Sequence, residues 1–104
     1  TLAISVVEPF SAGIGGGGFL LVRTGKTGSI DALDFRERAP LAATRNLYLD
    51  NQGKVHPRAS IDGHLAVAVP GTIGGLYAAH RRYGKLPWKD VVVPSVRLAQ
   101  DGFL

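Results

Sequence analysis

The stretch "GGFLLVRTGKTGSIDALDF", residues 17–35, predicts two strands joined by a tight turn. The run over 17–24 contains four consecutive apolar residues, 19–22, which is typical of a strand buried on both faces. The turn "GKTG", residues 25–28, has glycine at both ends, and "SIDALDF", residues 29–35, fits a returning antiparallel strand. A strand hairpin is therefore the expected centre of the fold.

The segments on either side of the hairpin predict a mixture of helices and one more strand. Residues 1–8 are apolar and fit either a short helix or a strand. After the hairpin we expect a short helix over 41–48, a surface loop to residue 63, a buried strand over 65–69, and helices over 71–84 and 86–103. This order predicts a mixed α/β (α+β) layer structure and argues against a helix bundle or an all-β sandwich.

The two C-terminal helices carry predictions about single residues. Thr72 is a suitable N-cap, and Gly84 stands where a left-handed C-terminal residue is wanted. Pro94 should kink or break the second helix. The pair Gly74–Gly75 weakens the first helix by roughly 1 kcal/mol per glycine relative to alanine. Such glycines are tolerable if another backbone packs closely there.

The glycine run before the hairpin resembles a nucleotide-binding turn only in its spacing. Gly13, Gly15 and Gly18 satisfy G-x-G-x-x-G, but the residues that follow are strand formers and no helix N-terminus is available for a phosphate. The Gly25–Lys26 pair lacks the upstream glycine of a P-loop, because Leu20 stands at that position. The run is better explained as a tight entry into a core strand, onto whose bare backbone another segment can pack.

Composition excludes several classes of function. The 12 Lys and Arg residues outnumber the 8 Asp and Glu residues but are scattered along the 104 positions, so we expect no nucleic-acid partner. The sequence has no cysteine, and its three histidines lack metal-ligand spacing, so we expect neither a metal nor a cofactor. No apolar run approaches ~18 residues, and we expect no membrane span. Without any methionine, the sequence is expected to be a fragment or a processed piece.

The strongest local signal for chemistry is "DFRERAP", residues 34–40. An arginine side chain binds a carboxylate through two parallel hydrogen bonds. From the residue types alone, two explanations stay open: an internal salt bridge of Arg36 or Arg38 with Asp34 or Glu37, or a site for a ligand carboxylate. Thr1 is not expected to be an N-terminal nucleophile, because it leads straight into an apolar segment.

Five motifs in order resemble the γ-glutamyltransferase (glutathione hydrolase) family. They are "VVEPFSAGIGGGGFLLV", "DFRERAP", "AVAVPGT", "RYGKLPW" and "RLAQDGF", and together they cover nearly the whole chain. The resemblance implies an N-terminal-nucleophile hydrolase with an αββα sandwich, made as a precursor that cuts itself into a large and a small subunit. Residues 1–104 would be an early part of the large subunit. The threonine nucleophile would belong to the small subunit, so no catalytic residue is expected here.

The resemblance also assigns roles to two residues. In the family's R-E-x-A-P motif the arginine holds the α-carboxylate of the glutamyl group, and the matching residue is Arg36. Glu37 would orient Arg36, whereas Arg38 falls at the variable position of the motif. The implied partners are the small subunit from the same precursor and a γ-glutamyl substrate such as glutathione. The family resemblance also suggests a periplasmic or secreted protein.

Other functions stay open at this point. Arg36 does not separate a glutathione hydrolase from a related acylase, such as a β-lactam side-chain acylase or a poly-γ-glutamate hydrolase. A non-catalytic remnant of the family is a further alternative.

Overall fold

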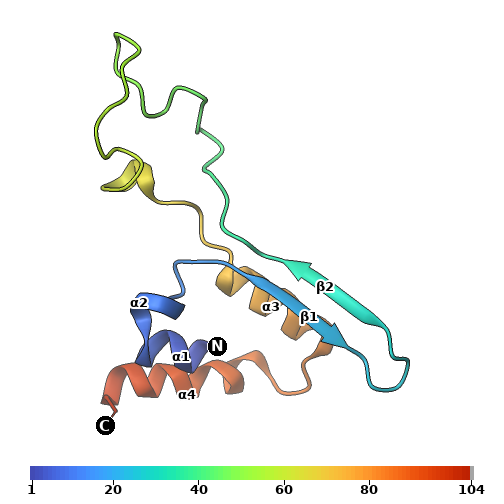
Figure 1. Cartoon of the computed structure of the whole chain (residues 1–104). Coiled ribbons are helices and arrows are strands. Elements are labelled where there is room, and N and C mark those ends of the chain that lie inside the picture. Colours follow the sequence, from blue (N-terminus) through green and yellow to red (C-terminus); the bar gives the residue numbers. More distant parts are fainter. Residues whose placement is uncertain (104) are drawn as a thin grey trace.

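The computed structural model describes residues 1–103 and contains the expected hairpin (Figure 1). The elements are α1 (Leu2–Val7), α2 (Pro9–Ala12), β1 (Phe19–Arg23), β2 (Ile30–Asp34), the 3-10 helix η1 (His64–Ala66), α3 (Thr72–Tyr83) and α4 (Trp88–Asp101). Strands β1 and β2 are antiparallel, with Phe19 opposite Asp34 and Arg23 opposite Ile30. The predicted mixed α/β class is confirmed.

The two faces of the hairpin differ in their surroundings. One face, which includes Leu20 and Leu33, packs against α3. On the other face Phe19, Leu21 and Ile30 are 66%, 73% and 67% exposed. Burial on both faces was expected, but residues 1–103 cover only one.

Two predicted elements after the hairpin are not formed as expected. Residues 41–48 make successive turns in place of a helix, with Pro40 accepting from Ala43 and Asn46 accepting from Leu49. Asn, Thr and Pro favour such turns over helix in the absence of packing that would impose one. The strand expected over 65–69 is replaced by η1, and only Val69 forms a bridge, to Arg38. A strand needs a partner along its length, and only Arg38 pairs with this segment in the part of the chain described here.

Helix α3 is capped differently from the prediction. Gly71 is its N-cap residue, and Thr72 is the first helical residue with no side-chain capping bond. The carbonyl of Gly16 accepts hydrogen bonds from the N–H groups of Gly71 (2.9 Å) and Thr72 (3.1 Å), which satisfies two of the free donors at this helix end. Gly84 has an extended backbone (φ −68°), so the predicted left-handed C-terminal residue is wrong.

Pro94 does not break α4, which continues from Trp88 to Asp101. Proline removes one backbone hydrogen bond, the one that would reach the carbonyl of Asp90. Both residues are exposed, so water can satisfy this carbonyl. The helix ends at Gly102, whose φ of 79° lies in the left-handed region.

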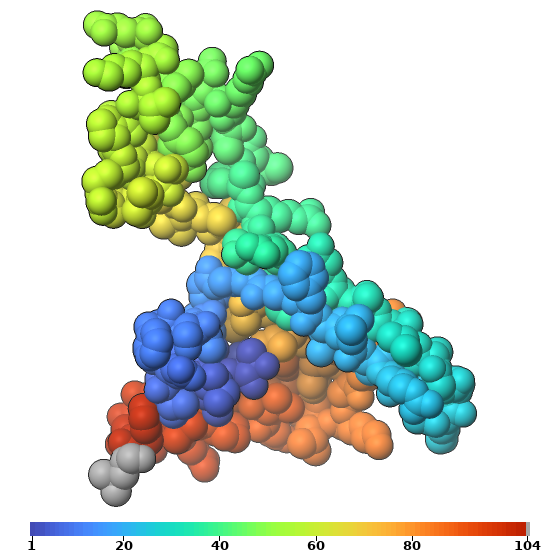
Figure 2. All heavy atoms as spheres, in the orientation of Figure 1, coloured from blue at the N-terminus to red at the C-terminus, as the bar shows by residue number. Residues whose placement is uncertain are grey.

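The described residues are spread out and do not enclose a hydrophobic core. Their radius of gyration is 18.1 Å, whereas a compact domain of this length has about 13 Å. Figure 2 shows residues 40–66, here called the lobe, standing apart from the helices and the hairpin. Below the hairpin, α1 packs along α4 (Figure 1). No apolar side chain among residues 1–103 is fully buried.

Candidate functional site

Arg36 lies two residues past the end of β2, in a segment that is neither helix nor strand. The carboxylate of Asp34 accepts a 2.9 Å hydrogen bond from the backbone N–H of Arg36. A backbone N–H that donates to the aspartate side chain two residues earlier forms a local Asx turn. Asp34 is therefore bound to the backbone of Arg36, and the structure shows no ion pair between Asp34 and the guanidinium within residues 1–103.

Within residues 1–103 the guanidinium of Arg36 has one charged partner, Glu37, and the contact is weak. Its Nε atom lies 3.8 Å from Oε1 of Glu37, and the two side chains are 65% and 34% exposed. This distance exceeds that of a hydrogen bond, and exposed ion pairs contribute only about 0–1 kcal/mol. A ligand carboxylate could therefore bind Arg36 at little cost in lost interactions.

The glycine run packs against the segment that carries Arg36. Gly18 and Phe35 exchange two backbone hydrogen bonds, of 2.9 and 3.4 Å. A Cβ atom at Gly17 would lie 2.5 Å from Oε2 of Glu37 and 2.6 Å from the carbonyl oxygen of Phe35. Within this run, the close approach of residues 35–37 requires a bare backbone at Gly17, which agrees with the expectation that another segment packs on the run.

Helix α3 holds the same segment from its other side. A Cβ atom at Gly71 would lie 2.8 Å from the carbonyl carbon of Phe35, and one at Gly75 would lie 2.5 Å from Cδ1 of its ring. A Cβ atom at Gly74 would meet nothing within 4 Å among residues 1–103. Of the two helical glycines, only Gly75 is therefore required by packing, in this case against Phe35. Sequence reasoning missed Phe35, although an aromatic residue directly before the arginine is a signal of such packing.

The backbone is also fixed after Arg36. Arg38 exchanges two backbone hydrogen bonds with Val69, of 3.2 and 2.8 Å. Its side chain forms no ion pair in the described part of the chain. The backbone is thus held on both sides of Arg36, while the side chain of Arg36 extends into solvent.

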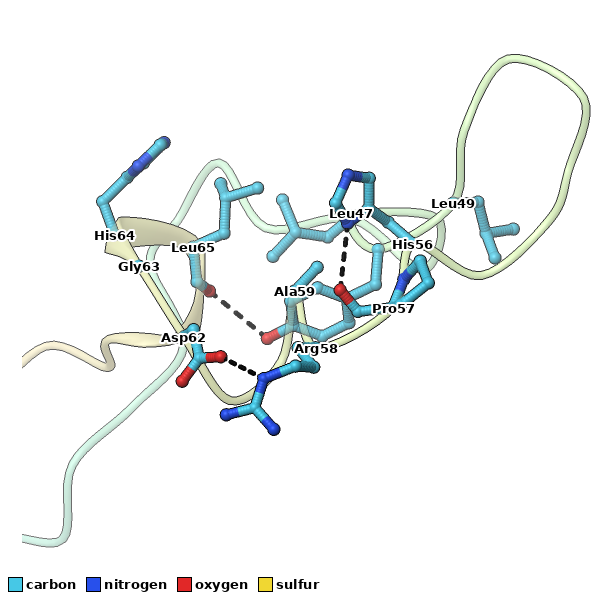
Figure 3. A pocket seen from close by; sticks show the side chains of 11 residues that line it. Leu47, Leu49, His56, Pro57, Arg58, Ala59, Asp62, Gly63, His64 and Leu65 are labelled. Carbon is cyan, nitrogen blue, oxygen red and sulfur yellow. Dashed lines mark hydrogen bonds and ion pairs between the residues drawn. The ribbon is translucent and has the colours of Figure 1, made fainter.

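The hollows of the surface lie beside this segment rather than around it. One of about 630 Å³ is lined by Phe35, Thr72 and residues 15–18 of the glycine run. Another, of about 530 Å³, lies in the lobe (Figure 3). Arg36 and Glu37 line neither of them.

The three histidines do not form a catalytic cluster with one another. His56 and His64 are exposed in the lobe, as expected, and Figure 3 shows the side chain of His64 directed away from the hollow. In the same view Arg58 pairs with Asp62. His80 lies on α3, with its ring centroid 5.1 Å from that of Trp88, and is half-buried as predicted for a core histidine.

Two kinds of feature are absent from residues 1–103. No group of three or more His, Cys, Asp or Glu side chains there could hold a metal ion. None of the helices in this range has the length and apolar run that a membrane crossing requires.

Comparison with known proteins gives matches along the whole chain. The family model described as Gamma-glutamyltranspeptidase matches residues 1–104. Glutathione hydrolase 3 of Arabidopsis thaliana is 47% identical over 104 residues, which are 100% of this chain and 16% of that protein. The glutathione hydrolase proenzyme of Escherichia coli is 45% identical over 102 residues, 98% of this chain and 17% of that protein. The chain thus spans about a sixth of the length of these curated relatives.

A solved structure has the same arrangement of elements. The crystal structure of Helicobacter pylori γ-glutamyltranspeptidase superposes with a TM-score of 0.90 at 45% identity, covering 98% of this chain and 29% of that one. The resemblance seen in the five sequence motifs is therefore confirmed by both sequence and structure comparison.

Proposed function

The chain belongs to the γ-glutamyltranspeptidase family, and we propose that it is part of an enzyme that hydrolyses or transfers the γ-glutamyl group of glutathione-like amides. In this proposal residues 1–104 are an early portion of the large subunit. The small subunit, cut from the same precursor, is the partner and supplies the threonine nucleophile. A relative 45% identical to this chain is named a proenzyme, which supports a precursor that is processed. The full-length protein is the longer precursor of which these residues are a part.

The observation that carries the proposal is the placement of Arg36. Its backbone is held by Asp34 on one side and by the Arg38–Val69 bridge on the other. Its side chain is exposed, and Glu37 approaches from the Nε side. The edge formed by Nη1 and Nη2 then stays available for the α-carboxylate of a glutamyl donor.

This placement fits the need of the reaction. The γ-carbonyl carbon of the donor must stay near the nucleophile, so the far end of the glutamyl group has to be fixed. A guanidinium bound through two hydrogen bonds fixes both position and orientation, because its fork is planar. In the same proposal Glu37 orients the guanidinium, with Oε1 near Nε and with Oε2 in the space that a Cβ atom at Gly17 would fill.

The test is Arg36→Ala in the full-length protein, assayed with a γ-glutamyl anilide. Loss of the arginine leaves the α-carboxylate without its partner, and we expect KM to rise at least about tenfold. Arg38→Ala is the matched control: it keeps the backbone bridge to Val69 and should leave KM within about twofold of the parent. An unchanged KM in Arg36→Ala would remove this residue from the substrate site.

A further inference from the structure

Residues 35–37 are enclosed by bare glycine positions from two elements far apart in the sequence. Gly17 precedes β1 and faces Glu37, whereas Gly75 lies in α3 and faces Phe35. We propose that Gly17 and Gly75 are positioning residues that set where the Arg36 guanidinium lies. This inference rests on the proposed function, in which Arg36 binds the α-carboxylate of the donor.

At Gly17 the contact reaches the backbone of residues 35–37, the segment that carries Arg36. A Cβ atom there would lie 2.6 Å from the carbonyl oxygen of Phe35 and would overlap the backbone nitrogen of Glu37 as well. Ordinary van der Waals contact begins near 3.4 Å. The Glu37 side chain could rotate away, but these two backbone atoms flank Arg36 directly. An alanine at Gly17 would therefore displace the peptide units on both sides of Arg36.

At Gly75 the contact reaches the base of the Phe35 side chain. A Cβ atom there would overlap Cβ and Cγ of Phe35 and would lie 2.5 Å from Cδ1. These atoms are close to the backbone, so rotating the ring does not relieve the overlap. Gly75 is itself buried, and Phe35 is fixed to Gly18 by two backbone hydrogen bonds. Relief requires movement of α3 or of the residue that directly precedes Arg36.

Such a movement has a specific consequence for binding. A displacement of about 1 Å of a positioned group can lower catalytic efficiency by as much as about 100-fold. Arg36 recognises only the α-carboxylate of the donor. A displaced guanidinium should therefore weaken the binding of donors that carry this carboxylate. It should leave unchanged the binding of a donor in which the carboxylate is converted to an amide. A general loss of folding would lower the activity on both donors equally.

The experiment compares two test variants with two matched controls in the full-length protein. The test variants are Gly17→Ala and Gly75→Ala. The controls are Gly15→Ala and Gly74→Ala, at neighbouring glycines where a Cβ atom would meet nothing within 4 Å in the described part of the chain. For each we measure KM and kcat with a γ-glutamyl anilide and with the same compound carrying an α-carboxamide. We expect the test variants to lose roughly tenfold in kcat/KM on the carboxylate donor, mainly through KM, and at most about twofold on the amide.

A double variant separates an effect on the position of Arg36 from a loss of activity that does not depend on Arg36. In an Arg36→Ala background, Gly17→Ala should cause no further loss of discrimination between the two donors. A further loss of similar size in that background would overturn the inference, as would equal losses on both donors in the single variants. If Gly75→Ala does not yield folded protein, the result with Gly17→Ala decides whether the inference holds. An unchanged KM in Arg36→Ala alone contradicts the proposed function instead, so the two failures are distinguishable.

Discussion

Tyr83, the last residue of α3, donates a 2.6 Å hydrogen bond to Oδ2 of Asp31, 52 positions earlier in β2. Arg82 binds the other oxygen of the same carboxylate through Nη2 at 3.1 Å. The opposite end of α3 is held by the contacts of Gly71 and Gly75 with Phe35. The hairpin is thus attached to α3 at both ends of the helix. These attachments fix the direction in which residues 35–37 leave β2.

The hydrogen bond to Asp31 should make the stability of this attachment depend on pH. It raises the pKa of Tyr83 above its ordinary value of 10.0, because the phenol donates to the carboxylate, with desolvation adding to the shift. A raised pKa in the folded state means that the stabilisation is complete below about pH 10 and is lost as the pH rises through the raised value. We expect Tyr83→Phe to lower the Tm of the full-length protein at pH 7, and the difference from the parent to shrink above about pH 10.

Thermal unfolding between pH 7 and pH 11 checks this prediction. Tyr77→Phe is the matched control, since Tyr77 is an exposed tyrosine of the same helix and keeps its ring contact with Trp88. A Tm difference for Tyr83→Phe that stays constant across this range would show that the phenol–carboxylate bond does not stabilise the attachment.

The hairpin turn allows a second comparison, between its two glycines. Gly28 has a φ of 71°, whereas Gly25 has no positive φ, and a Cβ atom at Gly25 would meet no described atom within 4 Å. Alanine in the left-handed region costs about 1–2 kcal/mol. We therefore expect Gly28→Ala to lower the free energy of unfolding by about this amount. Gly25→Ala should be neutral or stabilising by up to about 1 kcal/mol, because it restricts the unfolded chain. Urea unfolding of the two variants measures the difference, and equal effects would contradict it.

The sequence predicted what depends on neighbouring residues and missed what depends on distant ones. The hairpin follows from an apolar run, a glycine-flanked turn and a returning run, all within residues 17–35. The helix expected over 41–48 and the strand over 65–69 were wrong, because short apolar segments adopt the structure that their partners impose. The cap of α3 comes from the Gly16 carbonyl, which no local pattern around Thr72 indicates.

At the candidate site, too, some features follow from neighbouring residues and others depend on residues far away in the sequence. The arginine-rich motif stands out by its residue types, but choosing Arg36 over Arg38 required the resemblance to a family. The backbone contacts now add a physical difference between them, since Arg38 is paired with Val69 through its main chain while Asp34 closes a turn at Arg36. The packing of Gly75 on Phe35 joins positions 40 residues apart, and only a fold can bring them together.

Arg36→Lys tests whether the planar fork matters beyond its charge. Lysine keeps the positive charge but presents a single ammonium group, which cannot make two parallel hydrogen bonds to one carboxylate. In the full-length protein we expect its KM for a γ-glutamyl anilide to lie between those of the parent and of Arg36→Ala. Recovery to the parent value would mean that charge alone accounts for binding. A KM equal to that of the alanine variant would mean that charge contributes nothing.

The exposed face of the hairpin makes a prediction about the 104 residues produced alone. Phe19, Leu21 and Ile30 form an apolar surface on a two-stranded sheet whose outer edges have no partner strand within residues 1–103. Such a surface pairs readily with another copy of itself. We expect self-association at micromolar concentrations, seen as a rising mass in light scattering. Leu21→Lys should reduce it, whereas Leu41→Lys, at an exposed apolar position in the lobe, should not. A monodisperse monomer that melts cooperatively would show that the chain buries this face by itself, contrary to the exposure described here.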